Sequence, residues 1–266
     1  MLYDMHVHSK FSTDSTLDVE NAILQAINLG LSGIAFTDHL DIDFTDYEDE
    51  FHYDFNEYFN LLNFLKDKYN NKIEIISAVE VGMQPHVIQE TYDKIKDFNF
   101  DYIIGSTHLI KKRDPYCGNY FRPSDTKIDT YKEYLEEILN NLMLYKDFSF
   151  NTLGHIDYLV RYANFEDSTL YYKDFPTLID EILLFIINKN MSFEINTSTY
   201  LKKKFDINIL KRYKELGGEL ITLGSDAHSE DRIAANFYNY SILVKDVGFK
   251  YLYHFKNGQP VPTLIS

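Results

Sequence analysis

The sequence is poor in cysteine, in basic residues and in long apolar runs, and each shortage argues against a class of protein. Cys117 is the only cysteine in 266 residues, so the chain cannot form an internal disulfide or a paired-thiol metal or redox site. No run of eighteen or more apolar residues exists, which argues against a membrane-spanning helix. Asp4 and His6 come too early for the apolar segment of a secretory signal, so we expect a cytoplasmic protein.

Basic residues are outnumbered by acidic ones. There are 26 lysines and arginines against 41 aspartates and glutamates, which gives a net charge of −15. Such a chain repels polyanions at long range, so extended binding to nucleic acid is disfavoured and a small-molecule partner fits better. The run from Lys202 to Lys204 is the only basic cluster of note, and we interpret it as a solvated loop.

The chain also lacks linkers, low-complexity tracts and internal repeats, so we predict one domain over residues 1–266. With 45% hydrophobic residues it can bury a large core. Short apolar runs typical of strands alternate about seven times with amphipathic segments typical of helices. This alternation predicts an α/β fold, either a parallel β/α barrel or a doubly wound sheet.

The expected elements follow from these patterns and from the glycines and asparagines that interrupt them. Strands are expected at residues 2–8, 32–37, 72–81, 100–106, 152–154, 192–196 and 219–223. Helices are expected at residues 18–29, 55–69, 87–97, 125–145, 174–188 and 206–216, with another beginning near Arg232. Residues 40–54 are expected to form a loop, and Lys256-Asn257-Gly258 the turn of a C-terminal hairpin.

Six of the nine histidines fall at or just after the C-terminal ends of expected strands: His6, His8, His39, His108, His155 and His228. Side chains two residues apart in a strand point to the same face, so His6 and His8 would converge on one point. One such pair alone is more often a surface or packed pair than a chelate. In a barrel all strand ends meet at one mouth, whereas an open sheet spreads them along an edge. The repetition therefore favours a barrel with a metal site.

Two carboxylates extend the set of nitrogen and oxygen donors. Glu80 is the one inward-facing charge candidate of its strand, and Asp226 lies two residues before His228. Taken alone, Glu80 would more often be an edge-strand residue facing water. Together with the imidazoles, these carboxylates suit Zn, Mn, Fe or Co. Eight donors exceed the needs of one ion, so we expect two or three ions rather than a closed structural zinc site.

Taken together, the motifs resemble those of the polymerase and histidinol phosphatase (PHP) family. The matching motifs are His6-Val7-His8, Thr37-Asp38-His39, Glu80, Gly105-Ser106-Thr107-His108, Gly154-His155 and Gly224-Ser225-Asp226-Ala227-His228. The series spans almost the whole chain, and it is specific as a set. The resemblance implies a distorted (β/α)7 barrel with a trinuclear metal centre at its mouth.

The same resemblance assigns the ligands to three ions. It implies His6, His8, Glu80 and Asp226 for one ion, Glu80, His108 and His155 for a second, and His39 and His228 for a third. Some family members supply a further histidine to the third ion, and this chain has Asp14 at that position. A carboxylate is a competent replacement, so Asp14 joins the expected ligands.

The activity implied is phosphoester hydrolysis assisted by two or three Zn, Mn or Fe ions. Three divalent ions are balanced in charge by Glu80, Asp226 and Asp14 together with a hydroxide and a phosphomonoester dianion, which favours a monoester over a diester. Asp226 and His228 are the candidates for orienting the hydroxide or moving a proton. Arg161, Arg122 and Arg232 are candidates for holding phosphate, with Arg161 the best. For each arginine an exposed, solvated position is an equal alternative.

Within the family, the chain length, the long interval between His108 and His155 and the tail at 251–260 most resemble stand-alone histidinol-phosphate phosphatases of histidine biosynthesis. Acidic residues such as Asp41 and Asp43 could pair with the substrate amine. The alternatives are a phosphoesterase for nucleotide or sugar monoesters, a phosphotyrosine phosphatase, a 3′-end exonuclease, which the net charge disfavours, and a metal-binding module without turnover. We leave three histidines outside the site: His52, His86 and His254.

Overall fold

Parallel strands in chain order form the frame of the molecule. The structure is a computed structural model that describes residues 2–44, 51–118, 120–199 and 203–265. Within these residues the strands of the frame are β1 (Tyr3–Val7), β2 (Gly33–Phe36), β4 (Glu74–Gly82), β5 (Tyr102–Ser106), β6 (Thr152–Leu153), β7 (Ser192–Asn196) and β8 (Ile221–Gly224). Each pairs with the next in parallel. The result is a nearly closed barrel, as predicted, rather than a doubly wound sheet.

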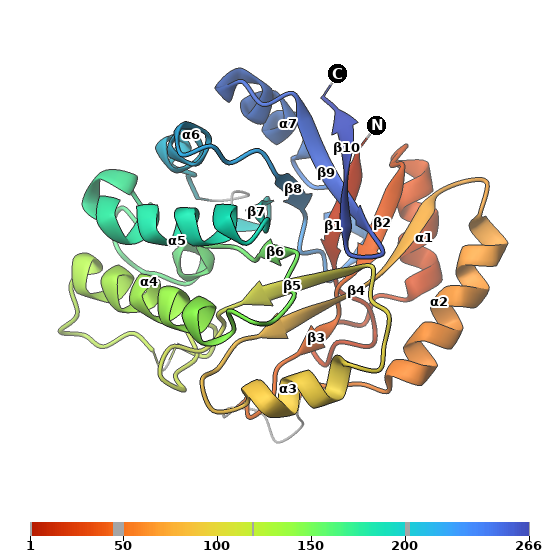
Figure 1. Ribbon diagram of the computed structural model, residues 1–266, viewed down its shortest axis with the longest axis horizontal. Coiled ribbons are helices and arrows are strands. Elements are labelled where there is room, and N and C mark those ends of the chain that lie inside the picture. The colour runs from red at the N-terminus through yellow and green to blue at the C-terminus, as the bar shows by residue number, and fades with distance from the viewer. Residues whose placement is uncertain (1, 45–50, 119, 200–202, 266) are drawn as a thin grey trace.

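Helices surround the strands on the outside of the barrel (Figure 1). They are α1 (Val19–Asn28), α2 (Phe55–Tyr69), α3 (Ile88–Ile95), α4 (Lys127–Leu144), α5 (Pro176–Asn188), α6 (Ile207–Glu215) and α7 (Phe237–Val247), with short 3₁₀ turns η1 (Tyr158–Arg161), η2 (Tyr172–Asp174) and η4 (Glu230–Arg232). Several begin at a side chain that accepts hydrogen bonds from the first-turn amides: Asp18, Asp54, Thr126 and Asp206. None of the helices in the described residues is both long and apolar enough to cross a bilayer.

The barrel closes between β8 and β1 through residues just beyond the ladder of β8. The Asp226 amide donates to the His6 carbonyl (2.7 Å), and the His8 amide donates to the Ala227 carbonyl (2.9 Å). Below them, the buried carboxylate of Asp4 accepts from the Ser225 amide (3.0 Å) and hydroxyl (2.6 Å). The first and last motifs of the chain are therefore held together by backbone hydrogen bonds.

Strand β1 is irregular where a regular strand was expected. Its register against β2 shifts between Asp4 and Val7, so β1 has one extra residue there. Met5 packs into the barrel interior, and its neighbour His6 points at the mouth. In a regular strand these two side chains would point to opposite faces, so the bulge explains how both reach the inside.

A short strand, β3 (His39–Leu40), lies where the expected loop begins. It pairs with β4, and His39 lies opposite Glu80. The β2–β4 ladder is interrupted between Phe36 and His39, and a side chain from α2 fills the break. The buried hydroxyl of Tyr58 donates to the Phe36 carbonyl (2.6 Å) and accepts from the Ala78 amide (2.9 Å). This contact supports the two strands immediately before His39 and Glu80.

The C-terminal hairpin of β9 (Tyr251–Lys256) and β10 (Gln259–Leu264) closes the end of the barrel opposite the mouth, where the strands begin. Asn257 and Gly258 have φ values of 49° and 71°, the left-handed conformations that a type I′ turn requires. Inside the barrel at this end, Phe255 packs in a cluster with side chains from four strands: Met5, Ala35, Ile76, Ala78, Tyr102 and Ile104. Pro260 and Pro262 lie in β10 opposite Phe255 and Tyr253.

The expected element boundaries agree with the structure to within two residues, with one exception. The last helix was expected near Arg232, but η4 ends there and α7 begins only at Phe237. Ala234 and Asn236 between them have φ values of 54° and 63°, which a right-handed helix cannot include. The prediction of the helix start was therefore wrong.

We predict that Tyr58→Phe lowers the free energy of unfolding by about 1–3 kcal/mol. The change leaves a buried carbonyl and a buried amide without their partner, and that is the usual cost of such a loss. Denaturant unfolding of the metal-free protein measures it. The control is Tyr238→Phe, because Tyr238 is 75% exposed and its hydroxyl is accessible to water. Equal unfolding of the two variants would contradict the role assigned to Tyr58.

Candidate metal centre

The C-terminal ends of the strands open into a pocket of about 570 Å³. Seven of the nine predicted ligands line it: Asp14, His39, Glu80, His108, His155, Asp226 and His228. The other two, His6 and His8, are fully buried beneath and contact Glu80 and Asp226. The structure therefore brings all nine residues together.

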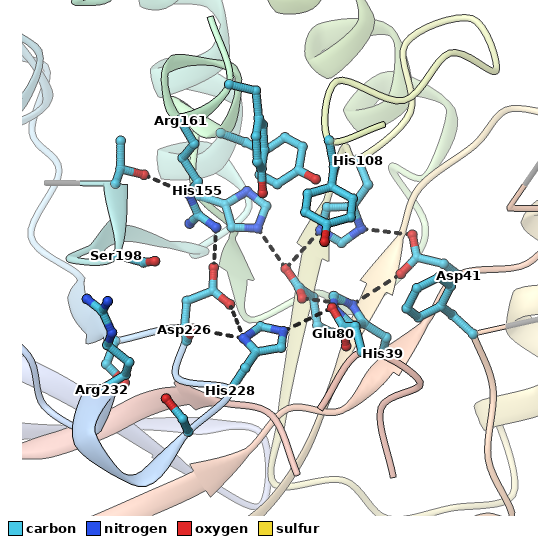
Figure 2. Close-up of a pocket in the computed structure, with 18 of the residues that line it drawn as sticks. His39, Asp41, Glu80, His108, His155, Arg161, Ser198, Asp226, His228 and Arg232 are labelled. Atoms are coloured by element: carbon cyan, nitrogen blue, oxygen red, sulfur yellow. Dashed lines mark hydrogen bonds and ion pairs between the residues drawn. The ribbon is translucent and has the colours of Figure 1, made fainter. Parts of the chain in front are cut away.

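Glu80 lies at the centre of this cluster, and both of its oxygens face imidazole nitrogens (Figure 2). Its Oε1 is 2.9 Å from His155 Nε2 and 3.3 Å from His108 Nε2. Its Oε2 is 3.1 Å from His39 Nδ1 and 3.2 Å from His6 Nε2. A carboxylate that faces imidazoles on both sides is placed to bridge two ions.

The two histidines of the N-terminal motif converge, as their spacing predicted. Their Nε2 atoms are 3.0 Å apart, and Asp226 Oδ1 lies 3.7 Å from His6 Nε2 and 3.2 Å from His8 Nε2. The Nδ1 atoms point away, His6 to Glu194 (2.6 Å) and His8 to Ser12 Oγ (3.1 Å). With Nδ1 engaged in each ring, both Nε2 atoms are directed to one point together with a carboxylate oxygen, which is a chelating arrangement.

The outer part of the cluster is built around Asp14. Its Oδ2 lies 3.1 Å from His228 Nε2 and 3.6 Å from His39 Nε2. The ring of His8 lies between the rings of His39 and His228, with centroids 4.2 and 4.3 Å away. Asp14 therefore lies beside the two histidines that the resemblance assigns to the third ion.

Buried atoms without hydrogen-bond partners indicate that the residues fit a metal. His39 Nδ1, Glu80 Oε2 and Asp41 Oδ2 are buried and make no hydrogen bond, although His39 Nδ1 lies within 3.3 Å of both oxygens. Buried polar atoms without a hydrogen bond lower the stability of a fold, and a cation bound between such atoms would remove that cost. Donor atoms lie within 4.8 Å of one another in four overlapping triads: His8, His39 and His228; His6, Glu80 and His155; His6, His8 and Asp226; His39, Glu80 and His108.

The carboxylates make the cluster strongly attractive to positive charge. Burial opposes a charge on His6, but the carboxylates of Glu194 and Glu80 outweigh it and raise the pKa of His6 well above its usual value. Burial also opposes a charge on His108, yet Asp41 and Glu80 raise its pKa to about 10. The same field favours divalent cations at these nitrogens.

Arg161 is the predicted phosphate-binding residue that the structure places best. Its Nη1 donates to Asp226 Oδ2 (2.6 Å) and its Nε to Thr199 Oγ1 (2.9 Å). Its Nη2 is buried and makes no hydrogen bond. In Figure 2 the guanidinium extends toward Asp226 from the side of His155. The Nη2 group therefore has no hydrogen-bond partner, on a guanidinium that lines the pocket and is held in position by Asp226 and Thr199.

The other basic residues lie at different distances from the pocket. Arg232 lines the pocket, with its side chain 48% exposed and its Nε 3.6 Å from Asp231. Arg122 does not line this pocket, because its guanidinium turns to Asp125 (2.9 Å) and Glu133 (3.6 Å), so the structure does not bring it together with the other predicted site residues. Lys203 lines the pocket, although its run was interpreted as a solvated loop; Lys202 lies outside the described residues.

The sequence did not single out two carboxylates that orient the cluster. Glu194 contacts His6, as described above, and was not assigned a role. Asp41 was considered a partner for the substrate amine, but its carboxylate lies 2.8 Å from His108 Nδ1 and 3.3 Å from His39 Nδ1. Asp43, the other acidic candidate, pairs instead with Lys112 and His86 (2.8 and 2.6 Å). The position of Glu194 within the expected strand 192–196 was the only sequence signal for either role.

Comparison of the sequence with known proteins finds relatives that are named as histidinol-phosphatases. The chain is 35% identical over 242 residues to a probable histidinol-phosphatase of Clostridium acetobutylicum, covering 90% of this chain and 91% of that one. It is 32% identical over 249 residues to the histidinol-phosphatase of Lactococcus lactis, covering 92% and 91%.

Solved structures and a family model agree with these relatives. The crystal structure of histidinol phosphate phosphatase from Lactococcus lactis, complexed with zinc, L-histidinol and phosphate, aligns with a TM-score of 0.87 and 30% identity over 98% of each chain. A putative histidinol phosphatase from Listeria monocytogenes aligns with a TM-score of 0.72 and 20% identity over 90% of this chain and 99% of that one, which supports the fold. A family model of the PHP domain matches residues 4–198. The chain therefore belongs to the PHP domain family.

Proposed function

We propose that this protein is a metal-dependent phosphatase that hydrolyses L-histidinol phosphate to L-histidinol and phosphate in histidine biosynthesis. The observation that carries the proposal is the cluster of histidines and carboxylates at the mouth of the barrel. It lies in a chain that aligns over 98% of its length with a phosphatase crystallised with zinc, L-histidinol and phosphate. As the chain's only cysteine, Cys117 cannot form an internal disulfide, which suits the cytoplasmic location that we also propose.

The nine clustered residues are the proposed ligands of two or three divalent transition-metal ions: His6, His8, Asp14, His39, Glu80, His108, His155, Asp226 and His228. When bound, such ions supply a water of lowered pKa and positive charge for the phosphoryl oxygens. The triads suggest that His39 can serve with Glu80 and His108 as well as with His228. Zinc is the first candidate, and manganese and iron suit the same donors.

We propose that arginines outside the ligand set hold the phosphate and that two of the nine ligands, Asp226 and His228, also help to move protons. Arg161 is fixed by Thr199 and Asp226, so its remaining donor can bind a phosphate oxygen with little loss of side-chain entropy. Arg232 is the second candidate for this contact. The side chain of His228 is 32% exposed, so it can exchange protons with solvent, and Asp226 orients the groups around it.

The rest of the pocket suits a flat aromatic substrate. Aromatic side chains form two walls, with Phe44 and Phe51 on one and Tyr116, Tyr158 and Tyr162 on the other. Such walls can pack against the faces of an imidazole ring. A pocket of about 570 Å³ is within the usual range for small-molecule sites.

We predict that phosphate release is fastest with histidinol phosphate. The assay compares it with an aryl phosphate, a sugar phosphate, a nucleoside monophosphate and a diester under the same conditions. We expect kcat/KM for histidinol phosphate to exceed the values for the other monoesters by at least about 100-fold, which corresponds to roughly 3 kcal/mol of selective contacts. If a generic aryl phosphate reacts equally well, the proposed substrate is wrong.

We predict that activity depends on bound transition metal. Elemental analysis of the purified protein should return two or three ions per chain, and removal of the metal with a chelator should abolish phosphate release until zinc or manganese is restored. His108→Ala should lower both the metal content and kcat. The matched control is His86→Ala, because His86 is exposed and pairs with Asp43 outside the cluster. Full activity in His108→Ala would refute the metal mechanism.

We predict that Arg161→Lys lowers kcat/KM by about 100-fold or more, because lysine cannot keep both present contacts and also bind phosphate. Arg122→Lys is the control for the loss of a guanidinium and should leave kcat/KM close to the wild-type value. Steady-state kinetics and inhibition by inorganic phosphate measure the two variants. An equal loss in both would contradict the positions described here.

A further inference from the structure

We propose that Glu194 is a positioning residue for the metal centre. Its carboxylate reaches His6 over a gap in β8 that exists because residue 224 is glycine, and it holds the His6 ring in the form that binds metal through Nε2. This inference rests on the metal-binding function proposed above and adds a residue that is outside the nine ligands. Two independent observations support it, the contacts of Glu194 and the close packing at Gly224.

Glu194 joins two ligands that come from different strands. It lies in the middle of β7 and is 4% exposed. Its Oε1 is 2.6 Å from Nδ1 of His6, which β1 supplies. Its Oε2 accepts a hydrogen bond of 2.7 Å from the backbone amide of His155, which follows β6. Both oxygens are therefore engaged, and each fixes the position of a different ligand.

The gap at Gly224 makes the contact with His6 sterically feasible. Strand β8 lies next to β7, and its end joins β1, so a side chain of β7 that reaches β1 must pass over β8. A Cβ atom at Gly224 would lie 2.3 Å from Glu194 Oε1 and 2.5 Å from the Cβ of His6. Any other residue would displace one of these two side chains.

The contact determines which nitrogen of His6 binds metal. A carboxylate only accepts hydrogen bonds, so the neutral ring of His6 must have its proton on Nδ1 and its lone pair on Nε2. That Nε2 faces Glu80 Oε2 and Asp226 Oδ1 at 3.2 and 3.7 Å. His8 has the hydroxyl of Ser12 at the equivalent nitrogen, so only His6 of this pair has a charged partner there. A carboxylate partner also makes the ring a stronger ligand.

Glu194→Gln tests the proposal with almost no change in side-chain size. The glutamine carbonyl must accept from the His155 amide, because that amide can only donate. The glutamine NH₂ group then faces His6 Nδ1, which favours a proton on Nε2, the nitrogen that would otherwise bind metal. We expect the affinity of one zinc ion to fall by about 10- to 100-fold while the other zinc sites change little. Competition with a chromophoric chelator measures this independently of catalysis.

Two further variants separate positioning from a general effect on the fold. Gly224→Ala fills the gap, so it should weaken the same zinc ion, and in the double variant the two changes should not add, because both act through one contact. Glu74→Gln is the matched control, because the Glu74 carboxylate accepts hydrogen bonds from Tyr3 and Lys256 at the opposite end of the barrel. The zinc affinities of this variant should equal the wild-type values.

Wild-type zinc affinity in Glu194→Gln, or a fully additive double variant, would overturn the inference alone. If the wild-type protein itself binds no zinc, the proposed metal function fails and this inference fails with it. Circular dichroism establishes that each variant is folded. If Gly224→Ala does not fold, the comparison of Glu194→Gln with Glu74→Gln still decides the question.

Discussion

The structure depends on the burial of one negative charge, the carboxylate of Glu80, in the middle of the barrel mouth. Such a charge is stable inside a protein only when partners surround it. Here the side chain of Ser106 donates to it (2.6 Å), and imidazoles delivered by several strands face it. Strand β4 pairs with β2, β3 and β5, so Glu80 is held by the most connected strand of the barrel. The other ligands converge because parallel strands end together.

The convergence of parallel strand ends explains why much of the ligand cluster could be predicted from the sequence. Most of the ligand motifs lie in or just after an apolar run of strand length, and parallel strands alternating with helices bring their C-terminal ends to one mouth. The residues that orient the ligands are different. Glu194 and His6 are 188 positions apart, and no local pattern records their contact. The guanidiniums show the same limit. The sequence ranked Arg161 above Arg122, but it did not show that Asp226 and Thr199 would hold Arg161 in the pocket while Asp125 holds Arg122 elsewhere.

The prediction of secondary structure succeeded where local sequence patterns determine the element. The prediction failed where contacts with distant residues determine it. The N-cap aspartates and the apolar periodicity fix most boundaries of the helices. The bulge in β1 and the break between β2 and β3 depend instead on what packs against them, as the hydroxyl of Tyr58 shows. The positive φ of Ala234 belongs to the same class, because alanine by itself favours a continued helix.

The prolines of the last strand have a consequence for how this protein can associate with other chains. Within the described residues β10 pairs with β9 alone, so its other side is an open edge. Proline has no amide hydrogen, so Pro260 and Pro262 fit the ladder only where that hydrogen would point to the open side. The edge therefore lacks two of the donors that an incoming strand would need. On the β10 side, the hairpin can therefore close the end of the barrel opposite the mouth without offering a complete template for sheet extension between molecules.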